Sequence, residues 1–182
     1  MNPLLYFRLK KSERLSDANL RFAGSSVWYP DLNIVFSRVK KSGNTAFRGF
    51  LRARAELIRE SEEHTACPEI ALTRVSGRDQ LEAALRSEFV VLVRNPFSRI
   101  LSAFLDKHVD SHLPQYASYP GLETGDPAGF ARFVRHIESS GFEDLHWVPQ
   151  TSSLLKPIER YDHVLRLENI FEDAQRVPAL SS

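Results

Sequence analysis

The sequence predicts an α/β fold, in which a single domain holds a central parallel sheet flanked by helices. Two stretches, residues 34–51 and 89–108, each read as an apolar strand that passes through a tight turn into a helix. Continuous apolar strands are typical of parallel sheets that are covered on both faces. A chain of 182 residues suits one domain with one core. We therefore expect one domain over residues 1–182, with residues 1–31 as a lead-in.

The first unit begins with a strand over residues 34–39, which is rich in β-branched and aromatic side chains. Gly43 permits a sharp turn, and Asn44 or Thr45 can cap the helix that follows. A helix that begins there directs unpaired N–H groups and a partial positive charge at the space above the turn. Lys41 adds a cation and Thr45 a hydroxyl, so the turn indicates a phosphate or sulfate site. The alternative is a plain polar loop, since matches this short are common by chance.

The order of lysine and glycine in this turn narrows the class of protein. In nucleotide triphosphatases a lysine follows the last glycine and sits on the helix start, where it reaches the terminal phosphates. Here Lys41 precedes Gly43. The order therefore disfavours an ordinary ATPase or GTPase.

The second unit has a strand over residues 89–93, which should end at Arg94 because Pro96 biases the residue before it toward an extended conformation. Pro96 is tolerated in the first turn of the helix that follows. Ser102 lies a little over two turns along that helix. Arg94 and Ser102 can converge on one phosphate, and arginine offers a planar fork of donors that matches phosphate oxygens.

In parallel sheets the ligand lies beyond the carboxyl ends of the strands, and both Lys41 and Arg94 fall there. The sequence thus predicts a P-loop-like nucleotide-binding core. Arg99 has two open interpretations: it joins the phosphate site, or it pairs with Asp106 on the surface.

The remaining elements are expected from local signals of composition and spacing. In chain order they are a short strand at residues 27–29, an exposed loop at 60–68, an amphipathic helix within 77–87, a long loop at 109–125, a helix that starts at Asp126 and Pro127 and ends at Gly141, a third core strand at 163–167, and a short helix from Glu168. The acidic cluster of Glu168, Glu172 and Asp173 is interpreted as a solvated face or a partner for Arg166.

Charge and cysteine content exclude several classes of protein. Because 24 basic side chains are balanced by 23 acidic ones, no global field recruits nucleic acid, and any anion site must be local. The single cysteine, Cys67, has no partner for an internal disulfide and no metal-ligand spacing around it. No apolar stretch approaches the length of a transmembrane helix, and residues 1–20 do not read as a targeting signal.

Four segments of the chain, in order, resemble one known family. They are Lys-Ser-Gly-Asn-Thr at residues 41–45, Arg-Asn-Pro-Phe-Ser-Arg-Ile-Leu-Ser-Ala-Phe-Leu-Asp-Lys at 94–107, His-Trp-Val-Pro-Gln at 146–150, and Tyr-Asp-His-Val with the acidic ending at 161–173. They look like the signatures of sulfotransferases that use 3′-phosphoadenosine 5′-phosphosulfate (PAPS). The branch that the chain resembles contains the carbohydrate sulfotransferases of the chondroitin and HNK-1 type with their bacterial relatives.

The chain also departs from this family pattern. Lys40 stands where proline is frequent, Asn95 stands where aspartate is common, and the cysteines that vertebrate members carry near the His-Trp segment are absent. Members usually continue further after Asp173, so we expect a minimal, truncated or partly degenerate copy, with a truncation after about residue 177. A Golgi member would begin with a membrane anchor. We therefore expect a cytoplasmic, bacterial protein, with a soluble fragment of a Golgi membrane enzyme as the alternative.

The resemblance implies transfer of a sulfuryl group from PAPS to a carbohydrate or other small hydroxylated acceptor, without a metal, leaving 3′,5′-bisphosphoadenosine. The residues that it implies around the 5′ end of the nucleotide are Lys41, Ser42, Gly43, Asn44 and Thr45. Arg94 and Ser102 would hold the 3′-phosphate. Lys41 would also stabilise charge as the sulfur–oxygen bond breaks.

An acceptor hydroxyl needs a general base, for which histidine or a carboxylate is the usual choice. The candidates are His146, His108, His112, Glu62 and Glu63. We favour His146 because it opens the segment that resembles the family, although a structural histidine beneath Trp147 is the alternative. Trp147, Tyr116 and Tyr119 either stack on an acceptor sugar or anchor loops to the core.

Three functions remain open from the sequence. The first is an active sulfotransferase, the second a kinase-like nucleotide enzyme on the same α/β core, and the third an inactive protein that keeps the nucleotide pocket. The lysine before Gly43 and the pairing of Arg94 with Ser102 disfavour the second. The sequence carries no signal for the oligomeric state.

Overall fold

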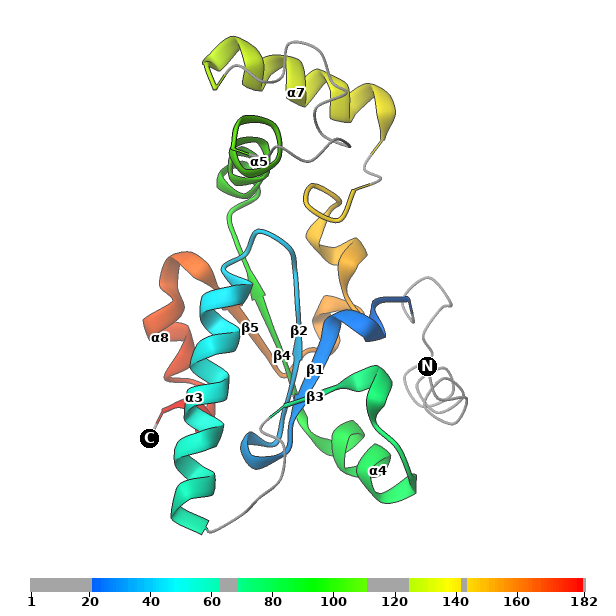
Figure 1. Cartoon of the computed structure of the whole chain (residues 1–182), viewed down its shortest axis with the longest axis vertical. Helices are drawn as coiled ribbons and strands as arrows, with labels where there is room; N and C mark the ends of the chain where they lie inside the picture. The colour runs from blue at the N-terminus through cyan, green and yellow to red at the C-terminus, as the bar shows by residue number, and fades with distance from the viewer. Residues whose placement is uncertain (1–20, 63–68, 111–124, 142–143, 182) are drawn as a thin grey trace.

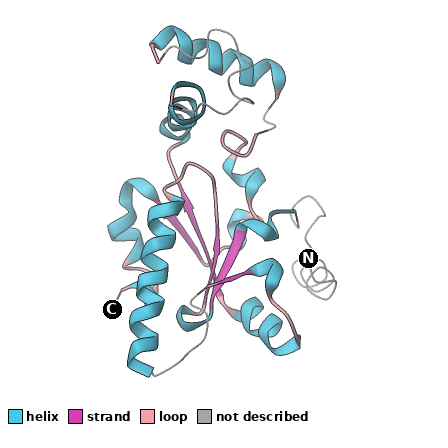
Figure 2. Cartoon of the chain, in the orientation of Figure 1, coloured by secondary structure: helices cyan, strands magenta, loops and turns pink. Residues whose placement is uncertain are grey.

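The computed structural model describes residues 21–62, 69–110, 125–141 and 144–181. These residues form a layered α/β domain in which a twisted sheet lies between helices (Figures 1 and 2). Several sequence predictions lie outside the described residues: most of the loops at 60–68 and 109–125, Cys67, and residues 1–20 of the lead-in.

The sheet has five described strands in the order β3-β1-β2-β4-β5. Their bounds are Ser26–Tyr29 for β1, Ile34–Ser37 for β2, Ile70–Ala71 for β3, Glu88–Val93 for β4 and His163–Arg166 for β5. Strands β2, β4 and β5 run parallel, as predicted for the two strand-turn-helix units and the third strand, and β5 lies at the edge of the described sheet.

The prediction of a parallel sheet is wrong at one edge, where β1 pairs antiparallel with both β2 and β3. A parallel neighbour needs a crossover of a dozen or more residues, whereas the 3₁₀ turn η2 (Pro30–Leu32) and Asn33 alone join β1 to β2. Asn33 takes the left-handed conformation, with φ of 52°, which lets the chain reverse at once. The described sheet is therefore mixed.

The α-helices of the described residues have the bounds Asn44–Glu62 for α3, Arg78–Arg86 for α4, Pro96–Phe104 for α5, Pro127–Ser140 for α7 and Ile170–Ala174 for α8. The helix α7 begins after its predicted cap, Asp126, whereas α8 begins at Ile170, two residues after the predicted start at Glu168. Asn95 caps α5 by accepting hydrogen bonds from the N–H groups of Phe97 and Ser98, and Asp126 caps α7 through the N–H of Gly129. Gly141 follows the last turn of α7 at φ of 81°.

The central strands are buried on both faces because their side chains alternate between two apolar clusters. Ile34 and Phe36 of β2 belong to the cluster under α3, whereas Val35 belongs to the cluster beside α4. Figure 1 shows α3 and α8 on one side of the sheet and α4 on the other. This double burial explains why the strands read as continuous apolar runs.

A third cluster lies beyond the carboxyl ends of β2 and β4. It joins α5 and α7 through Phe104 and Phe133, whose ring centroids are 5.4 Å apart, and it includes Trp147. After Phe104 the helix continues as one π-helical segment, η4 (Leu105–Val109). The cluster thus fixes α5, η4 and the segment around residue 147 at the same end of the sheet.

Candidate functional site

A cavity of about 490 Å³ opens at the carboxyl ends of β2 and β4. It collects residues from both strand-turn-helix units and from the His-Trp segment. Of the residues predicted for the site, those that line it are Lys41, Gly43, Asn44, Thr45, Arg94, Ser102 and His146. The two turns therefore face one space, as the parallel neighbours β2 and β4 require.

The turn between β2 and α3 is bent by two residues with positive φ. Lys41 has φ of 65° and Gly43 has φ of 76°. The N–H of Phe47 donates to the carbonyl oxygen of Gly43 at 3.0 Å, which begins the helical ladder. The N–H groups before it belong to the first turn of α3, which leaves them without partners inside the helix. The turn thereby offers backbone donors and a helix N-terminus to an anion.

Ser42 is the predicted site residue whose side chain does not reach the cavity. It is fully buried, at 0% exposure, and its hydroxyl donates to Oε1 of Gln150 at 3.2 Å. The same Oε1 accepts the backbone N–H of Arg94 at 3.0 Å, while Nε2 of Gln150 donates to the carbonyl oxygen of Arg94 at 2.7 Å. Gln150 thus fastens the two turns together, and Ser42 has only its backbone to offer a ligand.

The side chain of Asn44 forms its hydrogen bond within the turn rather than toward the cavity. Its amide nitrogen donates to the backbone carbonyl of Val39, and the side chain is buried. Its Oδ1 has no hydrogen-bond partner among the described residues. An oxygen acceptor repels a phosphate or sulfate oxygen, so the predicted contact of Asn44 with an anion reduces to its N–H group.

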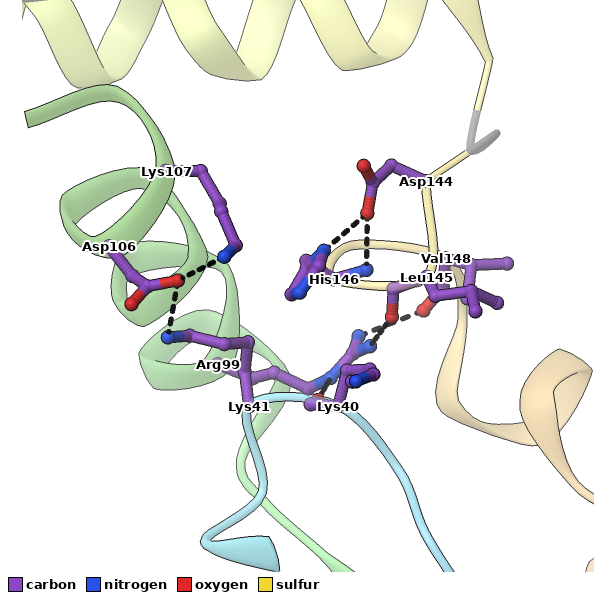
Figure 3. Close-up of polar contacts among 9 residues, drawn as sticks. All are labelled: Lys40, Lys41, Arg99, Asp106, Lys107, Asp144, Leu145, His146 and Val148. Carbon is purple, nitrogen blue, oxygen red and sulfur yellow. Dashed lines mark hydrogen bonds and ion pairs between the residues drawn. The ribbon is translucent and has the colours of Figure 1, made fainter. Parts of the chain in front are cut away.

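Lys41 forms an ion pair inside the cavity. Its Nζ lies 3.1 Å from Oδ2 of Asp106, which also lies 2.8 Å from Nζ of Lys107 (Figure 3). Hydrogen bonds from Lys107 and then Lys41 hold the pKa of Asp106 below its usual value. Lys41 keeps 18% of its side chain exposed and lines both this cavity and an adjoining one of about 300 Å³ with Arg94 and Ser102. The ammonium therefore stays within reach of a ligand.

Both interpretations of Arg99 are wrong. Its guanidinium neither faces the cavity nor pairs with Asp106; it is 2% exposed and donates to three backbone carbonyls. Nε reaches Lys40 at 2.8 Å, and Nη1 and Nη2 reach Val148 and Leu145 at 2.8 Å and 3.2 Å (Figure 3). Burial lowers the pKa of Arg99 to about 10, which leaves it charged near neutral pH. Arg99 thus ties the turn after β2 to the segment that carries His146.

His146 lies in the wall of the cavity with Asp144 beside it. Oδ1 of Asp144 is 2.6 Å from Nδ1 of His146 and also accepts the backbone N–H of His146 at 2.8 Å. Burial lowers the pKa of His146, Asp144 opposes that shift, and Lys107 and Lys40 lower it further. A neutral imidazole near neutral pH follows, which is the form that a general base requires.

His108 is the other candidate base whose side chain the structure describes, and it does not line the cavity. His108 is buried in the aromatic cluster, with its ring centroid 4.9 Å from that of Phe133 and 6.0 Å from that of Trp147. His108 therefore belongs to the aromatic cluster and not to the cavity. Trp147 is 5% exposed and packs edge-on against Phe133, so it anchors its segment. The side chains of His112, Glu62, Glu63, Tyr116 and Tyr119 lie outside the described residues.

An apolar cavity of about 390 Å³ adjoins the first one, and the two share Gly43, Ala46 and Leu167. Aromatic rings border it from two elements: Phe47 and Phe50 on α3, and Phe171 on α8. A flat apolar ring system fits such a space, because aromatic side chains pack favourably against it.

Sequence reasoning missed several residues of the site. The sequence does not predict the contacts of Asp106 with Lys41 and Lys107, and it assigns no role in the site to Arg38, Lys40, Asp144 or Gln150. The signal for Gln150 was its place in the segment that resembles the family. The acidic residue near the His-Trp pair carried the signal for Asp144, since a carboxylate two residues before a histidine can accept from its ring.

The described residues contain neither a cluster of metal ligands nor a helix that could span a membrane. No three side chains among their histidines, cysteines, aspartates and glutamates gather as metal ligands. Within the same ranges, every helix is too short or too polar to traverse a bilayer.

Comparison with known proteins identifies the family of the chain. No curated protein and no solved structure matches it. The model of the sulfotransferase family matches residues 26–182, which include every strand described above and the whole cavity. The chain therefore belongs to the sulfotransferase family.

Proposed function

We propose that this protein transfers a sulfuryl group from PAPS to a hydroxyl of a carbohydrate or another small hydroxylated acceptor. Membership of the sulfotransferase family supports the transfer of a sulfuryl group. The finer statement, PAPS as donor and a carbohydrate as acceptor, agrees with the residues around the cavity. One observation carries the proposal: Lys41 and Arg94 come from two different turns and line one cavity.

The two adjoining cavities match the chemistry of a nucleotide with phosphates on both sides of its sugar. The apolar cavity beside Gly43 suits a purine, while the polar cavity supplies cations and backbone donors for anionic groups. In this proposal the turn at Lys41 and Thr45 holds the 5′ end, and Arg94 with Ser102 holds the 3′-phosphate. The guanidinium of Arg94 also donates to the carbonyl oxygen of Lys41 at 3.3 Å, which links the two turns directly. The proposal thus includes a P-loop-like core.

Lys41 would exchange one anion for another when the nucleotide binds. Its ammonium now contacts Asp106, which retains Lys107 as a second cation after the exchange. A phosphosulfate oxygen would then take the place of Oδ2 of Asp106. Held there, Lys41 would neutralise the charge that develops on the bridging oxygen as the sulfur–oxygen bond breaks.

The ion pair of Lys41 with Asp106 also favours a second candidate function, an inactive protein that binds the nucleotide without transferring its sulfuryl group. In that case Asp106 would keep Lys41 when the nucleotide binds. The two functions share a binding site and differ only in turnover.

The test begins with binding, because a ligand that binds the native state raises its melting temperature. We expect stabilisation by 3′,5′-bisphosphoadenosine, and less or none by ATP. Transfer of labelled sulfuryl groups from PAPS is then measured across panels of glycans, lipids and phenols. Binding without transfer to any class would support the inactive protein, and stabilisation by ATP alone would point to a kinase-like enzyme and contradict the proposal.

Two variants separate the roles within the site. Lys41→Ala should lower turnover far more than stability, whereas Arg94→Ala should chiefly weaken the affinity for the bisphosphate. Arg78→Ala is the matched control, because Arg78 lies on α4, outside the lining of either cavity, and is exposed. Kinetics that stay at the level of the control in both variants would contradict the assignment of the site.

A further inference from the structure

Asp144 and His146 form a pair whose geometry fixes the position of one proton. A single oxygen of Asp144 lies 2.6 Å from Nδ1 of His146 and 2.8 Å from its backbone nitrogen. An ionised carboxylate only accepts hydrogen bonds, so Nδ1 must carry the proton that lies between them. In a neutral imidazole, the other nitrogen, Nε2, then holds the lone pair.

The backbone around this pair is held from two sides. The carbonyl oxygen of Asp144 accepts the N–H groups of Trp147 at 3.1 Å and Val148 at 2.8 Å, which closes a tight turn. Beneath the turn, Arg99 donates to two of its carbonyl oxygens, those of Leu145 and Val148. Figure 3 shows the His146 side chain between Asp144 and the cluster of Lys41, Asp106 and Lys107. The segment is thus built to hold the ring in one orientation.

We propose that Asp144 is a positioning residue, which keeps His146 in the Nδ1–H form so that Nε2 is the basic nitrogen toward the acceptor. This inference depends on the proposed function and adds a residue to it. In the transfer step, Nε2 takes the proton of the acceptor hydroxyl while the acceptor oxygen forms its bond to sulfur. The bond from sulfur to the 5′-phosphate oxygen breaks, and 3′,5′-bisphosphoadenosine leaves. Asp144 stabilises the imidazolium that results.

The charged groups around His146 set the pH range of this base. Burial lowers the pKa of His146, Asp144 opposes that shift, and Lys107 from η4 and Lys40 from the turn after β2 lower the pKa further. Asp106, Lys41, Arg38 and Arg94 line the same cavity. Because Asp144 stabilises the charged ring, its removal should lower the pKa of His146 further. The acidic limb of the rate profile should then move to lower pH.

Nitrogen NMR of histidine-labelled protein tests the pair directly, with the His146→Gln spectrum used for assignment. We expect His146 to show a protonated Nδ1 and an unprotonated Nε2 in the wild-type protein. In Asp144→Ala the two forms should mix, and the midpoint of the titration should fall. Asp144→Asn should keep the Nδ1–H form, because an amide oxygen still accepts, but should lose the effect of the charge.

Kinetics give the second measurement. Asp144→Ala should lower kcat by about 10-fold or more, with the KM for the nucleotide unchanged and Asp144→Asn intermediate. Glu88→Gln is the matched control, because Glu88 contacts Nε2 of His163 at 3.1 Å at the opposite end of β4. Loss of this carboxylate should change the hydrogen bond of His163 and leave kcat unchanged.

Two results would overturn the inference: a protonated Nε2 on His146 in the wild-type protein, or an Asp144→Ala variant with the titration and rate profile of the wild type. Failure of the proposed function looks different, because 3′,5′-bisphosphoadenosine would then give no stabilisation and no transfer would occur. The NMR readouts need no turnover, so they decide on the pair in either case.

Discussion

Gly43 shows how tightly one position of the turn is specified. Its φ of 76° is unfavourable for any residue with a side chain, and an added Cβ would lie 2.8 Å from Cδ1 of Leu167. Gly43→Ala should therefore lower the free energy of unfolding by about 1–3 kcal/mol. It should also weaken nucleotide binding, because the turn must shift away from Leu167. Urea denaturation and titration with 3′,5′-bisphosphoadenosine measure the two effects.

Gly49, in the helix that follows this turn, provides the control for that substitution. It lies inside α3, is exposed, and has nothing within 4 Å of an added Cβ. Gly49→Ala should raise the free energy of unfolding by about 0.5–1 kcal/mol, because alanine loses less backbone entropy in a helix. Equal stability of the two alanine variants would show that the turn is not strained at Gly43.

At the scale of residues, the sequence predicted the cationic side chains of the site but not the acidic residue with which Lys41 pairs. Lys41 and Arg94 were identified because strand ends and turns are local signals. Asp106 was interpreted as a surface partner of Arg99, but it pairs with Lys41 and Lys107. Such partners depend on how α5 and η4 pack above the turn, which local spacing does not encode.

At the scale of elements, Arg99 joins the turn after β2 to the segment at residues 144–150. Its bond to the carbonyl oxygen of Val148 is buried and the other two are partly buried, and a buried carbonyl without a donor costs about 1–3 kcal/mol. Arg99→Ala should therefore lower the free energy of unfolding by about 2–4 kcal/mol. Arg99→Lys should recover only part of the loss, because an ammonium lacks the planar fork of a guanidinium.

Hydrogen exchange distinguishes this role from general destabilisation. In Arg99→Lys we expect the amides of residues 144–150 to exchange faster, while those of α4 keep their wild-type protection. Arg78→Ala removes an exposed side chain of α4 and should change neither region. Uniformly faster exchange across the domain would contradict a local fastening role for Arg99.

The elements themselves were largely predictable. Strands β2 and β4 follow from continuous apolar runs, the start of α5 follows from Pro96, and that of α7 follows from Asp126 and Pro127. The antiparallel pairing of β1 was not predicted, because its partner depends on a connection too short for a crossover. The sequence therefore indicated which segments form helices and strands, but not how β1 pairs at the edge of the parallel strands.

At the scale of the whole molecule, the formal net charge of +1 hides a local concentration of cations. Arg38, Lys40, Lys41 and Arg94 all line one cavity, where Asp106 is the acidic residue among the described lining. Binding of an anionic nucleotide should therefore weaken with salt, because screening shortens the reach of these charges.

We expect the Kd for 3′,5′-bisphosphoadenosine to rise by roughly tenfold between 50 and 500 mM NaCl. Isothermal titration at several salt concentrations measures this change, and the melting temperature of the ligand-free protein controls for effects of salt on stability. A Kd that is insensitive to salt would show that the cations of the cavity do not contact the ligand.

The left-handed backbone at Lys41 has a consequence for protein engineering. An L-residue at φ of 65° carries a conformational penalty of about 1 kcal/mol that glycine would not. Lys41→Gly should thus melt at a higher temperature than the parent while its turnover falls sharply, which calorimetry and an assay of sulfuryl transfer to the acceptor would measure. A variant that is more stable but inactive would allow donor and acceptor to be crystallised together in the site.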